Sequence, residues 1–232
     1  MRTTFLWVVA FILVLGFTWK HEGTVLETTF SEDKVKFCIT GDTGKKSEIQ
    51  KKMTLMMEEE RCDRIIILGD IIYPDGIESA NDPQIKTKFE DYYLPLTQKD
   101  KKPKVALING NHDYLGNPMA WVEVAKKKKW ILMPSRYYME DVSGFCFYYL
   151  DSNMFTQSGY LWVALAKIQW LQNVWKEKEK TCHTEISMAH HPYRSVGRHS
   201  DAKGYIKQFY EWFVLDRSDY LISGHAHLIK DF

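Results

Sequence analysis

An uninterrupted apolar run that ends at an aspartate is the feature that most constrains this chain. Ile65–Leu68 places four bulky residues in a row, three of them β-branched, and Gly69 and Asp70 follow at once. Such a run suits a strand that is buried on both faces of a sheet, and glycine lets the backbone turn sharply behind it. Asp70 is therefore expected at the carboxyl end of a central strand, where open α/β sheets bind ligands. Taken alone, the motif is more typical of a turn aspartate that caps a helix.

The same arrangement recurs along the chain. Further strands are predicted at 34–40, 104–108, 144–150, 184–189 and 220–223, and each ends in polar residues. Helices are predicted between them at 47–60, 84–93, 161–180 and 207–215. Because a strand–helix–strand crossover leaves its two strands parallel, the residues that follow the strands are expected at one edge of a sheet. The alternation predicts an α/β layered fold.

The helix predicted at 47–60 has a methionine-rich face. Ile49, Met53, Met56 and Met57 recur at helical spacing, and we expect this face to pack on the sheet as ordinary core.

Length, composition and charge favour one large domain without a nucleic-acid partner. The chain has 232 residues, of which 45% are hydrophobic, and this suits one large domain rather than two. A formal charge of +1 gives no reason to expect nucleic acid.

The amino-terminal residues have the pattern of a targeting segment. Arg2 precedes an apolar stretch from Phe5 to Phe17, the pattern of a signal peptide. Residues 1–22 are therefore expected to be a signal peptide or an N-terminal anchor, and residues 23–232 the domain. The predicted location is the secretory pathway, secreted or lysosome-like. The alternative is membrane anchoring, in which an uncleaved segment with Trp19 and Lys20 as interfacial residues makes the only membrane contact.

Four cysteines are compatible with an oxidising compartment. Cys38, Cys62, Cys146 and Cys182 lack the C-x-x-C spacing of metal sites and allow three pairings. Cys38 and Cys146 lie in apolar, strand-like runs, so buried free thiols are at least as well supported.

Seven oxygen and nitrogen donors follow the predicted strands. They are Asp42, Asp70, Tyr73, Asn111, His190, His225 and His227. Without a thiolate, this set suits hard or borderline metal ions. Seven donors are too many for one ion and suit two ions that share a bridge, for which Asp70 is the natural choice. On extended backbone, the spacing of His225 and His227 would send both imidazoles to the same side.

The ordered motifs resemble a known family. They are Asp-x-Gly at 42–44, Gly-Asp-x-x-Tyr at 69–73, Gly-Asn-His-Asp at 110–113, a histidine before His-Pro at 190–192 and Gly-His-x-His at 224–227. Together they resemble the calcineurin-like metallophosphoesterase superfamily and, within it, the purple acid phosphatases of the tartrate-resistant type. Gly44 stands where the wider superfamily has histidine, and Tyr73 supplies the missing ligand. The resemblance implies an α-β-β-α sandwich. It also leads us to expect that strands beyond Phe232 are missing.

The resemblance also implies roles for the donors. Asp42, Tyr73 and His227 would hold the first metal ion, and Asn111, His190 and His225 the second, with Asp70 as the bridge. Family precedent makes these ions iron(III) plus iron(II), zinc or manganese. An iron(III) ion agrees with the chemistry of tyrosine, whose pKa near 10 means that only a strongly charged cation displaces its proton.

The implied activity is hydrolysis of phosphate monoesters by a metal-bound hydroxide. His112 would protonate the leaving group, Asp113 would orient His112, and His199 would be a second histidine that faces the substrate. One alternative is a phosphodiesterase or nucleotidase of the same superfamily, against which Tyr73 and Gly44 argue. Another is a non-catalytic, phosphatase-derived membrane scaffold. Such relatives typically lose ligands, and this chain has kept all seven.

Overall fold

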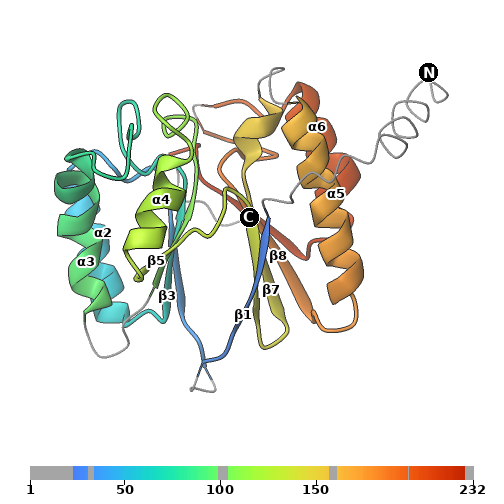
Figure 1. Ribbon diagram of the computed structural model, residues 1–232, viewed down its shortest axis with the longest axis horizontal. Helices are drawn as coiled ribbons and strands as arrows, with labels where there is room; N and C mark the ends of the chain where they lie inside the picture. The colour runs from blue at the N-terminus through green and yellow to red at the C-terminus, as the bar shows by residue number, and fades with distance from the viewer. Residues whose placement is uncertain (1–22, 31–33, 99–103, 157–160, 198, 228–232) are drawn as a thin grey trace.

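Two β-sheets pack face to face, and helices cover the outer face of each (Figure 1). A computed structural model describes residues 23–30, 34–98, 104–156, 161–197 and 199–227. Residues 1–22, for which we predict a signal peptide or anchor, lie outside the described residues. In the part of the chain that is described, no helix combines the length and the apolarity needed to cross a membrane. The four layers are those of the predicted α-β-β-α sandwich.

The first sheet is entirely parallel. Its order is β2 (Phe37–Thr40), β3 (Arg64–Leu68), β4 (Lys104–Ile108) and β5 (Ile131–Leu132). Every residue of β3 is buried, as its uninterrupted apolar run predicts. Figure 1 shows α2 (Glu48–Glu60), α3 (Asp91–Thr97) and α4 (Ala120–Lys127) on the outer face of this sheet.

The second sheet is mixed. Its order is β1 (Thr24–Thr28), β6 (Tyr138–Val142), β7 (Phe145–Leu150), β8 (Thr184–Ala189) and β9 (Tyr220–Ser223). Its one antiparallel pair, β6 with β7, is a hairpin closed by Ser143 and Gly144. Both turn residues have positive φ, 52° and 89°, as the two-residue turns that match strand twist require. On its outer face lie α5 (Leu161–Lys178) and α6 (Gly204–Phe209) (Figure 1).

Short helical turns replace parts of two predicted helices. The segment predicted at 84–93 forms the π-helical turn η1 (Lys86–Glu90) and continues into α3. The segment predicted at 207–215 begins earlier, with α6, and continues as η4 (Tyr210–Val214). A 3₁₀ turn, η2 (Ser152–Phe155), follows β7.

A buried ion pair joins the two sheets. The Arg64 guanidinium of β3 bonds to the Glu140 carboxylate of β6, and these side chains are 4% and 0% exposed. The Thr28 hydroxyl donates to Glu140 Oε1 at 2.5 Å, and the Tyr149 hydroxyl donates to Oε2 at 3.2 Å. These partners offset the cost of burying the charge. The sequence does not predict β6 as a strand, because its acidic residues interrupt the apolar pattern.

The predicted core face of α2 is wrong in part. Met57 is buried as predicted, but Ile49 and Met56 are 71% and 63% exposed, and Gln50 and Thr54 are buried instead. Gln50 is buried because its amide is satisfied: it donates to the Lys88 carbonyl oxygen at 2.8 Å and accepts from the Lys46 N–H at 3.0 Å. Apolar spacing alone therefore predicted only part of the buried face of the helix.

All four cysteines form disulfides, so the expectation of free thiols is wrong. Cys38 in β2 pairs with Cys62, which precedes β3, and Cys146 in β7 pairs with Cys182, which precedes β8. Both bonds therefore lie near the amino ends of parallel strands, opposite to the edge that carries the candidate ligands.

Candidate metal centre

Five loops at the carboxyl ends of the strands carry the predicted ligands. Asp42 follows β2, Asp70 and Tyr73 follow β3, Asn111 follows β4, His190 follows β8, and His225 and His227 follow β9. Three of these strands belong to the first sheet and two to the second. The structure brings all seven side chains together into two adjoining groups.

Strained backbone concentrates at these loops. Seven non-glycine residues in the described chain have positive φ, and four of them are predicted ligands: Asp42 (58°), Asp70 (50°), His225 (65°) and His227 (53°). Side-chain-bearing residues rarely adopt this conformation, and it is typical of functional sites. The extended backbone that we predicted for the His225–His227 segment is therefore wrong. The left-handed conformation sends the two imidazoles to different groups.

Glycines let the loops approach closely. A Cβ atom on Gly110 would lie 2.2 Å from both the backbone nitrogen and the Oδ1 atom of Asp70. A Cβ atom on Gly69 would lie 2.5 Å from His190 Nδ1. Close packing around Asp70 therefore requires both glycines, and the positive φ of Gly69, 87°, requires glycine there as well.

The Tyr73 hydroxyl lies at the centre of the first group. Its Oη atom is 2.8 Å from Asp70 Oδ2, 3.2 Å from Asp42 Oδ1 and 3.3 Å from His227 Nε2. His227 Nε2 is 3.6 Å from Asp42 Oδ1. Asp42, Asp70 and His227 thus form one cluster of metal-binding side chains, to which Tyr73 adds a fourth donor.

His190 lies at the centre of the second group. Its Nε2 atom is 2.9 Å from Asn111 Oδ1, 3.0 Å from His225 Nδ1 and 3.4 Å from Asp70 Oδ1. Its Nδ1 atom lies 2.8 Å from the Leu68 carbonyl oxygen and must carry the proton, because a carbonyl only accepts. The Nε2 lone pair therefore faces the Asn111 oxygen, and a cation held by both atoms would remove their repulsion.

Asp70 joins the two groups. Its Oδ2 atom faces Tyr73, and its Oδ1 atom faces His190 and accepts the His112 backbone N–H at 2.9 Å. The residue is only 1% exposed. A carboxylate that faces two donor groups with its two oxygens is suited to bridge two cations.

Burial sets the protonation of the donors. Burial and the neighbouring Asp70 carboxylate raise the pKa of Asp42 to about 6. Burial lowers the pKa of His190 to about 3 and that of His225 to about 4. At neutral pH Asp42 is thus ionised and both imidazoles are neutral, which are the forms that bind metal ions. The donor set therefore fits cations.

Tyr73 loses its phenol proton only under an electrostatic influence that is stronger than the effect of burial. Burial and the carboxylates of Asp42 and Asp70 raise its pKa well above the usual value. The phenol keeps its proton unless a highly charged cation lies beside it.

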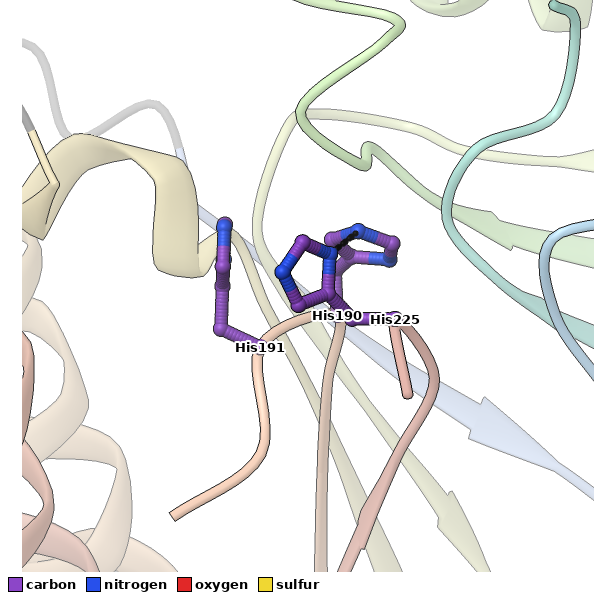
Figure 2. A group of neighbouring side chains, drawn as sticks. All are labelled: His190, His191 and His225. Atoms are coloured by element: carbon purple, nitrogen blue, oxygen red, sulfur yellow. Dashed lines mark hydrogen bonds between the residues drawn. The ribbon is translucent and has the colours of Figure 1, made fainter. Parts of the chain in front are cut away.

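A third imidazole that we did not predict as a ligand adjoins the second group. His190, His191 and His225 present nitrogen atoms within 4.8 Å of one another, and Figure 2 shows the His191 ring standing beside the hydrogen-bonded pair of the other two. The Nδ1 atom of His191 is bonded to the Ser152 hydroxyl at 2.8 Å. Burial lowers the pKa of His191 to about 2. Its place directly after His190 was the only sequence signal.

The three residues predicted to be catalytic lie at or beside the groups. The His112 side chain is 32% exposed, with Nε2 3.9 Å from Asp70 Oδ2. Its Nδ1 atom is bonded to the Pro74 carbonyl oxygen. The exposed His199 ring lies 3.9 Å from the His225 ring, centroid to centroid.

Asp113 differs from the prediction. Its buried carboxylate accepts the backbone N–H of Gly110 at 2.8 Å and that of Ile71 at 3.2 Å. It therefore ties the loop after β4 to the loop after β3, whereas the His112 ring bonds to the Pro74 carbonyl oxygen. Burial raises the pKa of Asp113 to about 7.

A cleft of about 430 Å³ opens beside the second group. His191, His199 and His225 are among the residues that line it. Phe155, Pro192, Tyr205 and Ile206 give it apolar walls, and Asp201 and Lys203 add one charge of each sign. An organic group attached to an anion at the histidines would fit this space.

Comparisons with known proteins identify the family of this chain. Residues 35–228 match the family model described as calcineurin-like phosphoesterase. Purple acid phosphatase 7 of Arabidopsis thaliana is 25% identical over 221 residues, which cover 86% of this chain and 66% of that protein. Purple acid phosphatase 3 of the same plant is 24% identical, over 89% of this chain and 61% of that protein. The chain thus spans about two thirds or less of the length of these relatives.

A shorter segment resembles an animal enzyme. Human tartrate-resistant acid phosphatase type 5 is 36% identical over 77 residues, 33% of this chain and 23% of that protein. Among solved structures, GAP50, the anchor in the inner membrane complex of Plasmodium, has a similar fold, with a TM-score of 0.66 and 22% identity over 85% of this chain and 68% of that chain. The match of the family model along most of the chain, together with the layered fold, establishes that the chain belongs to the calcineurin-like phosphoesterase family.

Proposed function

We propose that this protein is a binuclear, metal-dependent acid phosphatase of the purple acid phosphatase type, which hydrolyses phosphate monoesters. Family membership implies two metal ions. The observation that carries the proposal is the meeting of seven oxygen and nitrogen donors in two groups, with Asp70 facing both.

The two groups define the proposed ligand sets. Asp42, Tyr73 and His227 would hold the first ion, and Asn111, His190 and His225 the second, with Asp70 shared. The raised pKa of Tyr73 favours iron(III) at the first position, because a trivalent ion best displaces the phenol proton. The nitrogen-rich second position suits iron(II), zinc or manganese. When bound, two such ions would clamp a phosphate and lower the pKa of water enough to supply hydroxide near neutral pH.

His112 is the proposed general acid. The Pro74 carbonyl oxygen accepts the Nδ1 proton, so Nε2 faces the site, and the doubly protonated ring would deliver its Nε2 proton to the leaving oxygen and become neutral. His199, whose exposed ring is tilted against that of His225, would donate a hydrogen bond to the phosphate. The cleft beside them would hold the organic part of the substrate.

A secretory location fits the two disulfides, which persist in oxidising compartments. The amino-terminal apolar segment would direct the chain there, and it would be the only membrane contact if it is retained.

Hydrolysis of matched aryl esters tests the proposal. Purified protein should hydrolyse 4-nitrophenyl phosphate, should prefer it to bis(4-nitrophenyl) phosphate, and should lose the activity after exhaustive chelation. A preference for the diester would instead favour a phosphodiesterase. Absence of both activities in folded, metal-loaded protein would favour a non-catalytic scaffold.

A further inference from the structure

Three consecutive buried residues that are not proposed ligands connect two of the loops that carry proposed ligands. Asp151, Ser152 and Asn153 follow β7 and begin the η2 turn, and each is at most 2% exposed. Asp151 and Asn153 bond to the loop after β4, and Ser152 bonds to the loop after β8. The mechanism proposed above uses none of them.

Two of these residues hold the loop after β4 on either side of its functional residues. The Asn153 amide donates to the Asn109 carbonyl oxygen at 3.0 Å. The Tyr114 hydroxyl donates to Asp151 Oδ2 at 2.5 Å. Asn111 lies between these two attachment points, so its position depends on both.

The middle residue holds the loop after β8. The Ser152 hydroxyl oxygen accepts the His191 backbone N–H at 3.1 Å and lies 2.8 Å from His191 Nδ1. His190 immediately precedes this attachment point. Ser152 therefore fixes the chain direction at the histidine that lies at the centre of the second group.

The amide of Asn153 has one favoured orientation. Asp151 Oδ1 accepts both the backbone N–H and the Nδ2 amide of Asn153, each at 3.2 Å. The same nitrogen donates to Asn109, so the amide cannot turn over without losing both bonds. From α5, the Lys167 ammonium donates to the Asp151 carbonyl oxygen and holds the turn from behind.

These contacts matter because the second group draws on both sheets. Asn111 comes from the first sheet, whereas His190 and His225 come from the second. The three residues extend from β7 of the second sheet and reach the Asn111 loop of the first. The first group also draws on both sheets, because His227 follows β9, but the bonds of the three residues described above reach only the loops after β4 and β8.

We propose that Asp151, Ser152 and Asn153 are positioning residues that hold Asn111 in register with His190 and His225, and so set the metal affinity of the second group selectively. The inference rests on the proposed function, because it assumes that both groups bind metal ions. Partners of this kind typically change metal affinity 10–100-fold when removed.

Asn153→Ala is the direct test, with Asn117→Ala as its matched control. Asn117 is also an asparagine whose amide donates to a backbone carbonyl, that of Glu78 at 3.3 Å, but it is exposed. Full-length protein loaded with Zn²⁺ would be dialysed against buffers of graded free Zn²⁺, and the retained zinc measured by elemental analysis. In Asn153→Ala we expect the affinity for one of the two zinc ions to fall about 10–100-fold. In Asn117→Ala we expect neither affinity to fall.

Two further variants assign the weakened zinc site and guard against simple misfolding. Asp42→Asn, in the first group, should lower the affinity for the other zinc ion. The double variant with Asn153→Ala should show both losses of affinity, and they should be additive. Ser152→Ala should reproduce the selective loss through the opposite loop. For hydrolysis, kcat should fall in Asn153→Ala more than the melting temperature accounts for when compared with Asn117→Ala.

The outcomes separate this inference from the function on which it rests. Wild-type protein that retains two zinc ions, with Asn153→Ala and Ser152→Ala behaving like Asn117→Ala, would overturn the positioning role alone. Parallel weakening of both zinc sites would also overturn it, since that result indicates general destabilisation. Wild-type protein that retains no zinc would overturn the metal centre and the inference together.

Discussion

At the scale of single residues, the bond between His112 and the Pro74 carbonyl oxygen determines which ring nitrogen faces the metal centre. Because a carbonyl accepts only, His112 Nδ1 carries a proton and Nε2 remains toward Asp70. The proton-transferring atom in the proposed mechanism is therefore set by the loop that follows Tyr73.

Replacing His112 with alanine should lower the rate without emptying the site. General acids typically contribute about 10²–10⁴-fold, and the loss should be largest for alkyl phosphates, whose leaving oxygens need a proton most. The measurement is kcat for a series of leaving groups, together with metal content. Loss of metal from His112→Ala would mean that the residue is a ligand instead.

Lys167 gives a residue-scale prediction of pH dependence. Its side chain is fully buried, and burial lowers its pKa from 10.5 to about 7. Between these values the unfolded chain binds one more proton than the folded protein, so the contribution of Lys167 to stability rises with pH. Below pH 7 Lys167 is charged in the folded protein as well, so the full cost of burying the ammonium lowers the stability there.

Lys167→Met should remove this slope. Above pH 7, the unfolding free energy of the wild type should rise relative to that of the variant by up to about 1.4 kcal/mol per pH unit. Urea denaturation at several pH values between 7 and 10 measures it. A difference that does not change with pH would show that Lys167 is charged and well compensated throughout that range.

Sequence reasoning predicted which side chains meet but not how the backbone presents them. The donors lie after strands, and parallel strands bring their carboxyl ends together, so convergence followed from strand order. The left-handed conformation of His225 had no sequence signal, because such a conformation persists only where the surrounding structure imposes it. The tripeptide Asp151–Asn153 was also missed, since its partners are distant backbone and ring atoms.

At the scale of elements, α2 shows the limit of hydrophobic spacing. Its apolar residues lie on more than one face, and the buried face is chosen by Gln50, whose amide is satisfied by Lys88 and Lys46. Similarly, β6 carries Glu140 inside the core, paired with Arg64. In both elements, polar side chains with distant partners override the local pattern.

Two adjacent methionines test this arrangement of α2. Met57 is buried and Met56 is 63% exposed. Met57→Ala should therefore destabilise the protein by about 2–5 kcal/mol, whereas Met56→Ala should stay within about 0.5 kcal/mol. Chemical denaturation of the two variants provides the comparison. Equal effects would contradict the observed orientation of the helix.

At the scale of the whole molecule, stability and chemistry occupy opposite ends of the sheets. The disulfides lie near the amino ends of the strands and the candidate ligands beyond the carboxyl ends. The layered order of sheets and helices was predictable from the alternation of apolar runs. The pairing of cysteines was not, because three connectivities fit the sequence equally.

Removing one disulfide should lower stability while sparing the metal centre. The closed segments have sequence separations of 24 and 36, for which chain entropy gives roughly 3–4 kcal/mol each. We expect Cys38→Ser with Cys62→Ser to lower the unfolding free energy by about that amount and to retain both metal ions. Metal loss from the folded variant would show that the two ends are coupled.

The central claim is that Asp70 links two metal positions, and metal stoichiometry tests it most directly. Elemental analysis of purified wild-type protein and of Asp70→Ala, with folding checked by circular dichroism, should give two ions per chain and none, respectively. Two ions retained in folded Asp70→Ala, or none in the wild type, would contradict a pair of cations that share this carboxylate.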